Sequence, residues 1–330
     1  MVNDEFDLGR FAQSYAGLVL FVLGALSFGR LAQRLSAHEV DYTLRFVFGV
    51  LLVCGVLGVF GFAPFTPDDA RKPVVFFSEP SHYALAFLPF LFYMSAIAGR
   101  RRRIGVLMAG LAIALLLKST TMLAGVLLIV MVVYRLRLRV VLLLIAFGVA
   151  VANVEYYAAR VMLTSDTSNV SALAYLQGWE RAFLNLRDTR GYGVGFQQFG
   201  IFGAMGEFRE ALELLEAETL SLYDGASVAS KLIGEFGWAG VAILILYVRR
   251  FLRGLKEFRE ASVSSSRTHD PRLIFFMACF IMYSIDLFVR GTGYFSHSGF
   301  IFLASLAWMG RPEKKRLHVP ELPDGTAAVV

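Results

Sequence analysis

The chain has 330 residues, of which 57% are apolar and 14% are aromatic, and its mean hydropathy is +0.60. Soluble domains are usually less apolar, so this composition excludes an ordinary soluble enzyme. The net charge of +6 is also compatible with nucleic-acid binding, but the basic residues lie in short segments between apolar runs, where they orient a membrane protein. We therefore expect a lipid bilayer around the chain and no nucleic-acid partner.

Apolar runs recur along most of the chain, and none alternates in the manner of a barrel strand. Because the first run is followed by arginines, it is not a cleavable secretion signal. Cys54 and Cys279 lie inside apolar runs and predict neither a disulfide framework nor a zinc site. The sequence predicts an all-α polytopic membrane protein with about nine spans (eight to ten), and residues 1–310 form one integral membrane domain. The predicted spans are residues 11–29, 44–63, 82–99, 104–117, 121–134, 140–157, 228–248, 273–290 and 294–310.

Basic residues gather in alternate connections between these spans, in "GRRRRIG", "YRLRLRV", "RRFLRGLKEFRE" and "RPEKKR". Loops rich in Lys and Arg stay on the cytoplasmic side of a membrane. This asymmetry predicts that the N-terminus lies outside and the C-terminus inside. The tail 311–330 has three prolines and no apolar period, so we expect it to be cytoplasmic and disordered.

The spans 104–117 and 121–134 form a short hairpin with "KSTT" at its tip. Fourteen residues give about 21 Å of helix, less than the ~30 Å of a hydrocarbon core. In one interpretation Lys118 lies in the outer half of the membrane and faces a cavity or a partner charge. In the other, neighbouring residues extend both helices or Lys118 snorkels outward.

The longest polar segment, residues 158–227, is predicted to lie outside and contains "YLQGWERAF". In this piece Gln177 and Arg181 share one face of a helix, and an Arg fork suits phosphate because it is planar and permanently charged. Trp179 could stack on a sugar ring, although a place at the lipid interface is the more common use. The piece "GEFREALELLEAETL" predicts an amphipathic helix that lies on the outer membrane face or covers a cavity, with one apolar face formed by Phe208, Leu212 and Leu215.

A glycine-rich turn, "GYGVGFQQFG", follows the piece "YLQGWERAF". No strand precedes it, so it is not a dinucleotide fingerprint. The backbone amides at Gly193 and Gly195 could contact an anion, but a plain turn explains the glycines equally well.

Ionisable residues in or beside apolar spans are costly in lipid, which makes function their default interpretation. Under the predicted topology they all lie at the outer ends of their spans, which indicates one polar site that opens outward. Two pairs have the i,i+4 spacing of a structural ion pair, Lys231 with Glu235 and Asp286 with Arg290. Glu155 precedes two tyrosines, which favours a structural place at the interface. The full set is Glu79, His82, Lys118, Glu155, Lys231, Glu235, Asp286, Arg290 and His297.

The stretch "FFSEPSHYALAF" predicts the start of a helix, with Ser78 as the cap, Pro80 in the first turn and Glu79 favoured by the helix dipole. These local preferences do not explain His82 at the head of an apolar run. Near the C-terminus, the glycines of "RGTGYFSHSG" form a flexible turn that we expect to bring Arg290 and His297 together.

The sequence contains no metal-ligand spacing of histidines or acidic residues and no G-x-S-x-G, so we expect neither a metal, a cofactor nor a serine triad. The remaining set of Arg, Lys, His and a few carboxylates suits an anionic, lipid-linked substrate. Cations would stabilise a departing diphosphate, and a carboxylate or imidazole would take the proton of an attacking hydroxyl.

Several of these segments together resemble the bacterial Wzy-type O-antigen and exopolysaccharide polymerases and the related O-antigen ligases: "FFSEPSHYA", "KSTT", "YLQGWERAF…GYGVGFQQFG" and "RGTGYFSH". The resemblance implies a GT-C-like, metal-independent glycosyltransferase of the bacterial inner membrane with a large periplasmic loop. Such enzymes join oligosaccharide repeats carried on undecaprenyl diphosphate at the periplasmic face. A flippase and a chain-length regulator are the partners expected beside it.

The resemblance also assigns roles to individual residues. Arg181 and Arg290 would contact the diphosphate, Lys118 and His297 would assist, and Glu79 or His82 would be the base. Gln177, Gly193 and Gly195 would complete the diphosphate-binding set. Nine spans is a low number for that family and only one long outer loop is clear, which leaves a reduced or non-catalytic relative open.

Three alternatives remain open at the level of sequence. A ligase would use the same donor chemistry as a polymerase. A flippase or other transporter of lipid-linked oligosaccharides predicts repeated halves and charges at mid-membrane, neither of which the sequence displays. An accessory membrane subunit of a polysaccharide assembly complex is the third.

Overall fold

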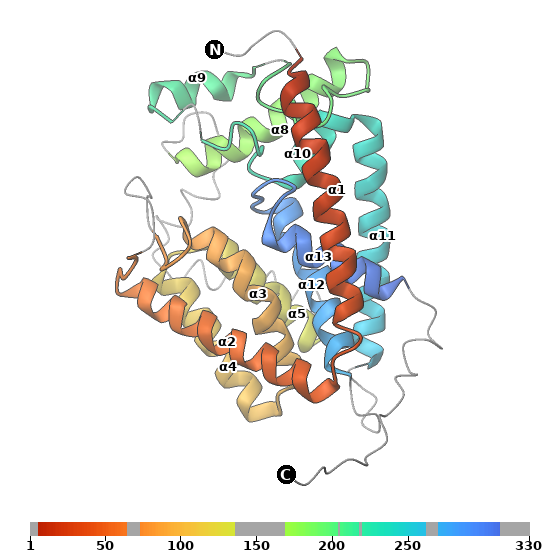
Figure 1. Ribbon diagram of the computed structural model, residues 1–330. Helices are drawn as coiled ribbons and strands as arrows, with labels where there is room; N and C mark the ends of the chain where they lie inside the picture. The colour runs from red at the N-terminus through yellow and green to blue at the C-terminus, as the bar shows by residue number, and fades with distance from the viewer. Residues whose placement is uncertain are drawn as a thin grey trace.

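The computed structural model describes residues 6–64, 73–135, 169–203, 205–217, 220–261 and 270–310. Those residues are helical apart from their connections, which contain two isolated β-bridges, Val74 with Phe77 and Phe199 with Phe202. Figure 1 shows the arrangement of the helices: α1 (Leu8–Leu31), α2 (Ala37–Val59), α3 (Pro80–Ile97), α4 (Arg100–Leu116), α5 (Thr120–Val133), α8 (Val170–Asp188), α9 (Glu207–Leu214), α10 (Val228–Phe236), α11 (Trp238–Ala261), α12 (Pro271–Phe288) and α13 (His297–Met309).

The all-α prediction is confirmed for the described residues. Three of their helices, α1, α2 and α12, are long and apolar enough to cross a membrane, and α5 and α13 are shorter apolar helices. These helices fall on predicted spans, as do α3 and α4. The predicted span 140–157 with Glu155, and the predicted tail 311–330, lie outside the described residues.

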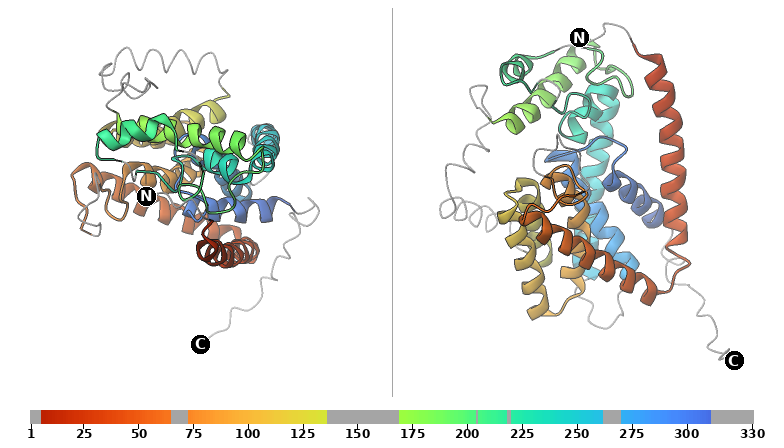
Figure 2. Two further views of the ribbon diagram at one scale, coloured as in Figure 1. Left: turned by 90° about the horizontal axis from the view of Figure 1, so that it is seen from above. Right: turned by 60° about the vertical axis from the view of Figure 1, so that its left-hand side comes forward.

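Helix α12 is the central helix of the bundle. Nearly all of its side chains are buried, and it packs against α3, α13, α11 and α2 (Figure 1). A helix that is apolar on most sides suits such an interior position. Helix α1, by contrast, lies along the outside of the bundle against α13 and leaves Leu20 71% exposed (Figure 2). Its outer surface has the character of a helix that faces lipid.

The predicted span 228–248 is wrong as a single helix. Helix α10 ends at Phe236, and α11 begins at Trp238. Between them Gly237 has a φ of +58°, a conformation that favours glycine. The amide of Trp238 donates to the carbonyl of Gly191 at 2.9 Å, which holds the break against the glycine-rich turn. The hydropathy of the segment is continuous, so hydropathy alone does not detect this break.

Hydrogen bonds between distant segments define two ends of the bundle. At one end Arg10 of α1 donates from Nε to the carbonyl of Gln197 at 3.0 Å. At the other end Arg272 of α12 donates to the carbonyl of Leu35 at 3.0 Å, and the Tyr93 hydroxyl donates to Asp41 at 2.5 Å. Helices α8, α9 and α10 form a layer across the end at which α1 begins (Figure 1).

The α4–α5 hairpin shows the predicted extension by neighbouring residues for one of its two helices. Helix α4 starts at Arg100 and has 17 residues, so the arginines extend it beyond the predicted span, whereas α5 has 14 residues. Lys118 occupies the turn with a φ of +51° and is exposed. Ser119 caps α5 by accepting from the amide of Met122 at 3.2 Å.

Candidate functional site

The start of α3 forms one wall of a polar cluster. Pro80 is the first helical residue, as predicted, but the N-cap is Glu79 rather than Ser78. The Ser78 hydroxyl instead hydrogen-bonds the Nδ1 atom of His82 at 2.9 Å. The Glu79 carbonyl accepts from the amide of Tyr83 at 3.2 Å, while its side chain makes no capping bond and is left for other partners.

The carboxylate of Glu79 forms an ion pair with Arg290, with 3.3 Å between Oε2 and Nη2. The Ser81 hydroxyl donates to the same oxygen at 2.8 Å. Burial opposes ionisation of Glu79, but the charge of Arg290 and the Ser81 hydroxyl outweigh it, so the pKa of Glu79 lies below its usual value. At neutral pH this end of the bundle therefore holds a charged carboxylate and a charged guanidinium in contact.

The predicted i,i+4 pair of Asp286 with Arg290 does not form. Helix α12 ends at Phe288, before it reaches Arg290, so the two residues no longer share a helical face. Asp286 is buried and accepts from the hydroxyls of Ser296 and Ser298 instead. Because α12 ends at Phe288, Arg290 lies beyond the helix and its side chain contacts Glu79 instead.

Residues 220–226, the cation-binding loop, contact basic side chains from four parts of the chain. The Ser221 hydroxyl accepts from Arg290 Nη1 at 2.9 Å. The carbonyl of Tyr223 accepts from Lys231 Nζ at 2.7 Å, and the Tyr223 ring lies 4.8 Å from the guanidinium of Arg10. The carbonyl of Leu222 accepts from Arg181 Nη1 at 3.5 Å.

Sequence reasoning did not identify this loop. Two of its four contacts are made by backbone carbonyls, which every residue carries, so the residue types in the loop do not reveal these contacts. The available signal was the polar, glycine-containing stretch "SLYDGAS" directly before a predicted helix.

The two histidines of the predicted site lie near this cluster. His82 is within electrostatic range of Glu79, Arg290 and Asp224, and also of His297. His297 begins α13, after the predicted turn. The turn therefore brings His297 to the same end as Arg290, although within the described structure no hydrogen bond joins the two side chains.

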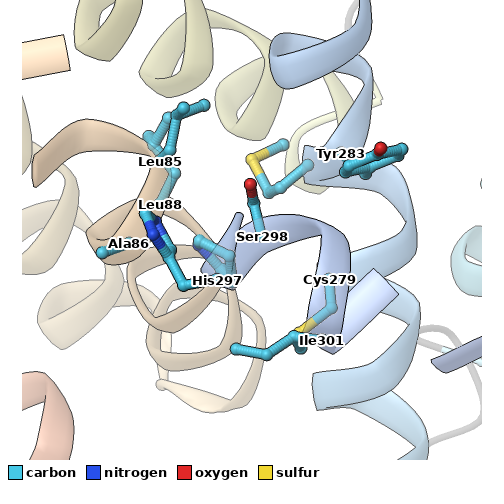
Figure 3. A pocket seen from close by; sticks show the side chains of 10 residues that line it. Leu85, Ala86, Leu88, Cys279, Tyr283, His297, Ser298 and Ile301 are labelled. Carbon is cyan, nitrogen blue, oxygen red and sulfur yellow. The ribbon is translucent and has the colours of Figure 1, made fainter. Parts of the chain in front are cut away.

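A small pocket lies between α3, α12 and α13 beside His297 (Figure 3). Its walls are mainly apolar, from Leu85 and Leu88 of α3 and from residues of α12 and α13, among them Ile301. His297 and Ser298 supply polar atoms to it, and Ser298 donates to the buried carboxylate of Asp286. The pocket has room for little more than a water molecule, well below the volume of a usual ligand site.

Lys231 and Glu235 form the ion pair that their spacing predicts, with 3.7 Å between Nζ and Oε1. Their side chains are only 4% and 0% exposed. Lys231 also donates to the Oε1 atom of Gln197 at 3.2 Å, and Glu235 accepts from the amide of Phe199 at 3.2 Å. These contacts support the structural interpretation of this pair.

Arg181 and Gln177 share a face of α8, as predicted, but both are buried. The guanidinium of Arg181 lies 5.0 Å from the centre of the Phe199 ring, and its Nε and Nη2 atoms have no hydrogen-bond partner in the described part of the chain. Burial, together with the charge of Arg209, lowers the pKa of Arg181 to about 10, so the group remains charged at neutral pH. Arg181 and Arg290 thus reach neighbouring residues of the cation-binding loop and not each other.

The backbone amides of the glycine-rich turn are engaged within the protein. Gly193 donates to the hydroxyl of Thr189 at 2.8 Å, and Gly195 donates to the carbonyl of Glu235 at 2.9 Å. Both glycines have positive φ values, and a Cβ at Gly193 would lie 2.4 Å from the carbonyl oxygen of Glu235. The structure thus favours the plain turn over the predicted anion contact, because these amides have no free hydrogen.

The acidic amphipathic segment forms α9, which packs against α8. Phe208 and Leu212 contribute to a small apolar cluster with residues of α8, whereas Leu215 is 40% exposed. Glu180 of α8 accepts from the amides of Glu207 and Phe208 at 2.8 and 3.1 Å, and this carboxylate satisfies donors at the start of α9. The predicted apolar face therefore contacts α8 through two of its three residues.

Within the described ranges, no group of three or more His, Cys, Asp or Glu residues is placed to hold a metal ion. Comparisons of the chain with protein-family models, with curated proteins and with solved structures give no match. The described residues define a helical protein with candidate membrane-spanning helices and a polar cluster at one end of its bundle.

Proposed function

We propose that the chain is a membrane glycosyltransferase that polymerises oligosaccharide repeats carried on undecaprenyl diphosphate. The observation that carries the proposal is the contact of Glu79 with Arg290 at the head of α3, with His82 in electrostatic range of both. A guanidinium at one end of a bundle of apolar helices suits a diphosphate joined to a lipid. A carboxylate and an imidazole in the same place suit the removal of a proton from a sugar hydroxyl.

In the proposed reaction, a hydroxyl oxygen of one repeat forms a bond to the anomeric carbon of the sugar that the donor lipid carries. The bond from that carbon to the diphosphate breaks, and the lipid diphosphate leaves with the electron pair. Arg290 would stabilise the charge that develops on the leaving group. Glu79 or His82 would accept the hydroxyl proton.

The other assigned residues receive uneven support. His297 lines the pocket and lies in electrostatic range of His82, which supports an assisting role. Arg181 and Gln177 are buried, so contact of either with a diphosphate requires the cation-binding loop or Phe199 to move. The role of Lys118 rests on the resemblance, and we leave Gly193 and Gly195 out of the proposed site.

The setting proposed for this reaction is the bacterial inner membrane, with a GT-C-like arrangement of about nine spans. The polar cluster would face the periplasm, and the end that carries Arg272 and the start of α4 would face the cytoplasm, as the positive charges of the connecting loops indicate. A flippase would deliver the lipid-linked repeats, and a chain-length regulator would act beside the polymerase.

The proposal is tested with purified protein, reconstituted in lipid, and undecaprenyl-diphosphate-linked repeats from the host cell. We expect wild-type protein to form polymer, and we expect Arg290→Ala to reduce the rate by at least about 100-fold. Arg290→Lys should rescue poorly, because a lysine cannot contact two groups in the fixed geometry of a guanidinium. Arg250→Ala is the matched control and should form polymer as wild type does, since Arg250 forms an exposed pair with Glu257 on α11.

The product of this assay distinguishes a polymerase from a ligase. Polymer from lipid-linked repeats alone supports a polymerase. Transfer only to a different acceptor, such as a lipid A core, indicates a ligase. Normal polymer formation by Arg290→Ala would contradict the proposed site.

A further inference from the structure

Arg290 is held by two protein groups in the positions that a ligand oxyanion would take. Its Nη1 atom donates to the Ser221 hydroxyl at 2.9 Å, and its Nη2 atom donates to Glu79 at 3.3 Å. The Arg290 and Glu79 side chains are 17% and 33% exposed, so this contact is only partly buried. The Glu79 bond is the longer of the two, and its acceptor belongs to a different part of the chain.

We propose that Glu79 is an internal substitute for the ligand: an incoming diphosphate takes its place on Arg290, and the released carboxylate becomes the general base. The base role rests on the proposed glycosyl transfer. The exchange itself requires only that an oxyanion binds Arg290.

Charge explains why the exchange would favour the ligand. A guanidinium binds a phosphate through two parallel hydrogen bonds, whereas Glu79 occupies only one nitrogen of Arg290. A sugar diphosphate also carries more negative charge than one carboxylate. The diphosphate therefore competes well for Arg290, although the displacement of Glu79 reduces its net binding free energy.

Charge also explains why release would create a base. While Arg290 holds Glu79, that cation keeps the pKa of the carboxylate low, and burial acts in the opposite direction. Once a diphosphate neutralises Arg290, burial dominates and the carboxylate binds a proton more readily. The charged and titratable groups that face this site from neighbouring elements are His82, Asp224, Arg290 and His297.

The hydrogen bonds of Glu79 leave one of its oxygens available. Arg290 and Ser81 both donate to Oε2, so Oε1 accepts no hydrogen bond from the described residues. His82 is the competing candidate, because the Ser78 hydroxyl occupies only its Nδ1 atom and its Nε2 atom can also take a proton. In the step proposed, the hydroxyl proton moves to Glu79 as the sugar oxygen bonds to the anomeric carbon and the lipid diphosphate leaves.

The test measures proton uptake on binding, with full-length protein in nanodiscs and a short-chain prenyl diphosphate sugar as the probe. This probe is a diester of diphosphoric acid, so its phosphates do not titrate in the range used. Calorimetry in buffers of different ionisation enthalpy gives the number of protons taken up. A scan between about pH 4 and 6.5 brackets the ordinary pKa of glutamate.

We expect wild-type protein to take up protons on binding, because Glu79 gains affinity for a proton when Arg290 is neutralised. Glu79→Gln should reduce this uptake to the part that His82 and His297 contribute, and it should tighten binding by about tenfold, since the internal competitor is weakened. Glu79→Asp keeps the carboxylate and should retain some uptake. Glu257→Gln is the matched control, because Glu257 pairs with Arg250 on the exposed face of α11, and it should behave as wild type.

Binding without proton uptake, with an unchanged affinity in Glu79→Gln, would overturn the exchange even if the protein forms polymer. Coupled uptake without any transfer of sugar would support the exchange and contradict the proposed reaction. If the probe does not bind wild-type protein, or binds Arg290→Ala equally well, then Arg290 is not the anion site and the inference falls.

Discussion

Glu79 and Arg290 are 211 positions apart in the sequence, yet their side chains form an ion pair with 3.3 Å between Oε2 and Nη2. The pair joins the start of α3 to the segment that follows α12. The next residue, Gly291, donates its amide to the carbonyl of Ala226 at 2.9 Å and so ties the same segment to the cation-binding loop. Three parts of the chain therefore meet at Arg290.

This ion pair predicts a pH dependence of stability. The pKa of Glu79 is lower in the folded protein than in the unfolded chain, so the folded state binds fewer protons in the acidic range. The stabilisation is complete above the unfolded value and is lost as the pH falls through the folded value. We expect the melting temperature of wild-type protein in detergent to fall more steeply on acidification than that of Glu79→Gln. Parallel pH profiles for the two proteins would contradict this prediction.

The buried pair of Lys231 and Glu235 predicts strong coupling between two substitutions. Lys231→Met leaves the carboxylate of Glu235 buried without its cation, and we expect a loss of about 3–5 kcal/mol in the free energy of unfolding. Glu235→Gln alone leaves the ammonium group without its anion. The double variant should lose much less than the sum of the two, because neither charge remains.

A double-mutant cycle on the melting transition measures this coupling. The exposed pair of Arg250 with Glu257 is the control, and its coupling should not exceed about 1 kcal/mol. Additive effects at Lys231 and Glu235 would mean that the two side chains do not interact in the folded protein.

Much of the helical framework could be predicted, because hydropathy and local caps are properties of the sequence itself. Pro80 marks the start of α3. Local preference favours Ser78 as the cap, but Glu79 occupies that position without a capping bond from its side chain. The failed pairing of Asp286 with Arg290 has a different cause. The i,i+4 rule requires a continuous helix, and α12 ends at Phe288, before the second residue.

Other parts of the site depend on contacts that no local pattern carries. Ser221 meets Arg290 across 69 positions of sequence, and Leu222 meets Arg181 through a carbonyl. The break at Gly237 depends on the distant carbonyl of Gly191. A single glycine within an apolar run is too common to identify such a position.

Gly237 provides a test of that break. Alanine at this position would keep a φ of +58° that L-residues rarely adopt, and its Cβ would lie 1.9 Å from the carbonyl oxygen of Gly191. We expect Gly237→Ala to reduce the free energy of unfolding by on the order of 3 kcal/mol. Gly49→Ala on α2 is the control, because a Cβ there meets nothing within 4 Å and alanine favours the helix.

Thermal unfolding of the two alanine variants in detergent gives the comparison. The Gly49 variant should be as stable as wild type or slightly more stable. Equal stability of the Gly237 variant would mean that α10 and α11 can join without the glycine conformation.

The buried guanidinium of Arg181 leads to the last prediction. Its side chain is 0% exposed, and among the described residues its Nε and Nη2 atoms have no hydrogen-bond partner and no carboxylate bonds to it. Burying a charge without an ionic partner costs free energy, and an apolar side chain of similar volume removes that cost. We therefore expect Arg181→Met to keep the free energy of unfolding of wild type or to raise it.

Measuring both polymer formation and the free energy of unfolding of Arg181→Met distinguishes a functional from a structural role of this residue. If the chain retains Arg181 because it contacts a diphosphate after the cation-binding loop moves, Arg181→Met should fold normally and form little polymer. Arg187, an exposed arginine paired with Asp188 on the same helix, is the control and should affect neither property. A stable Arg181→Met protein with normal polymer would remove Arg181 from the proposed site. A loss of several kcal/mol in stability would instead show that the guanidinium holds the loop through its contacts with Leu222 and Phe199, because a methionine of similar length cannot replace either contact.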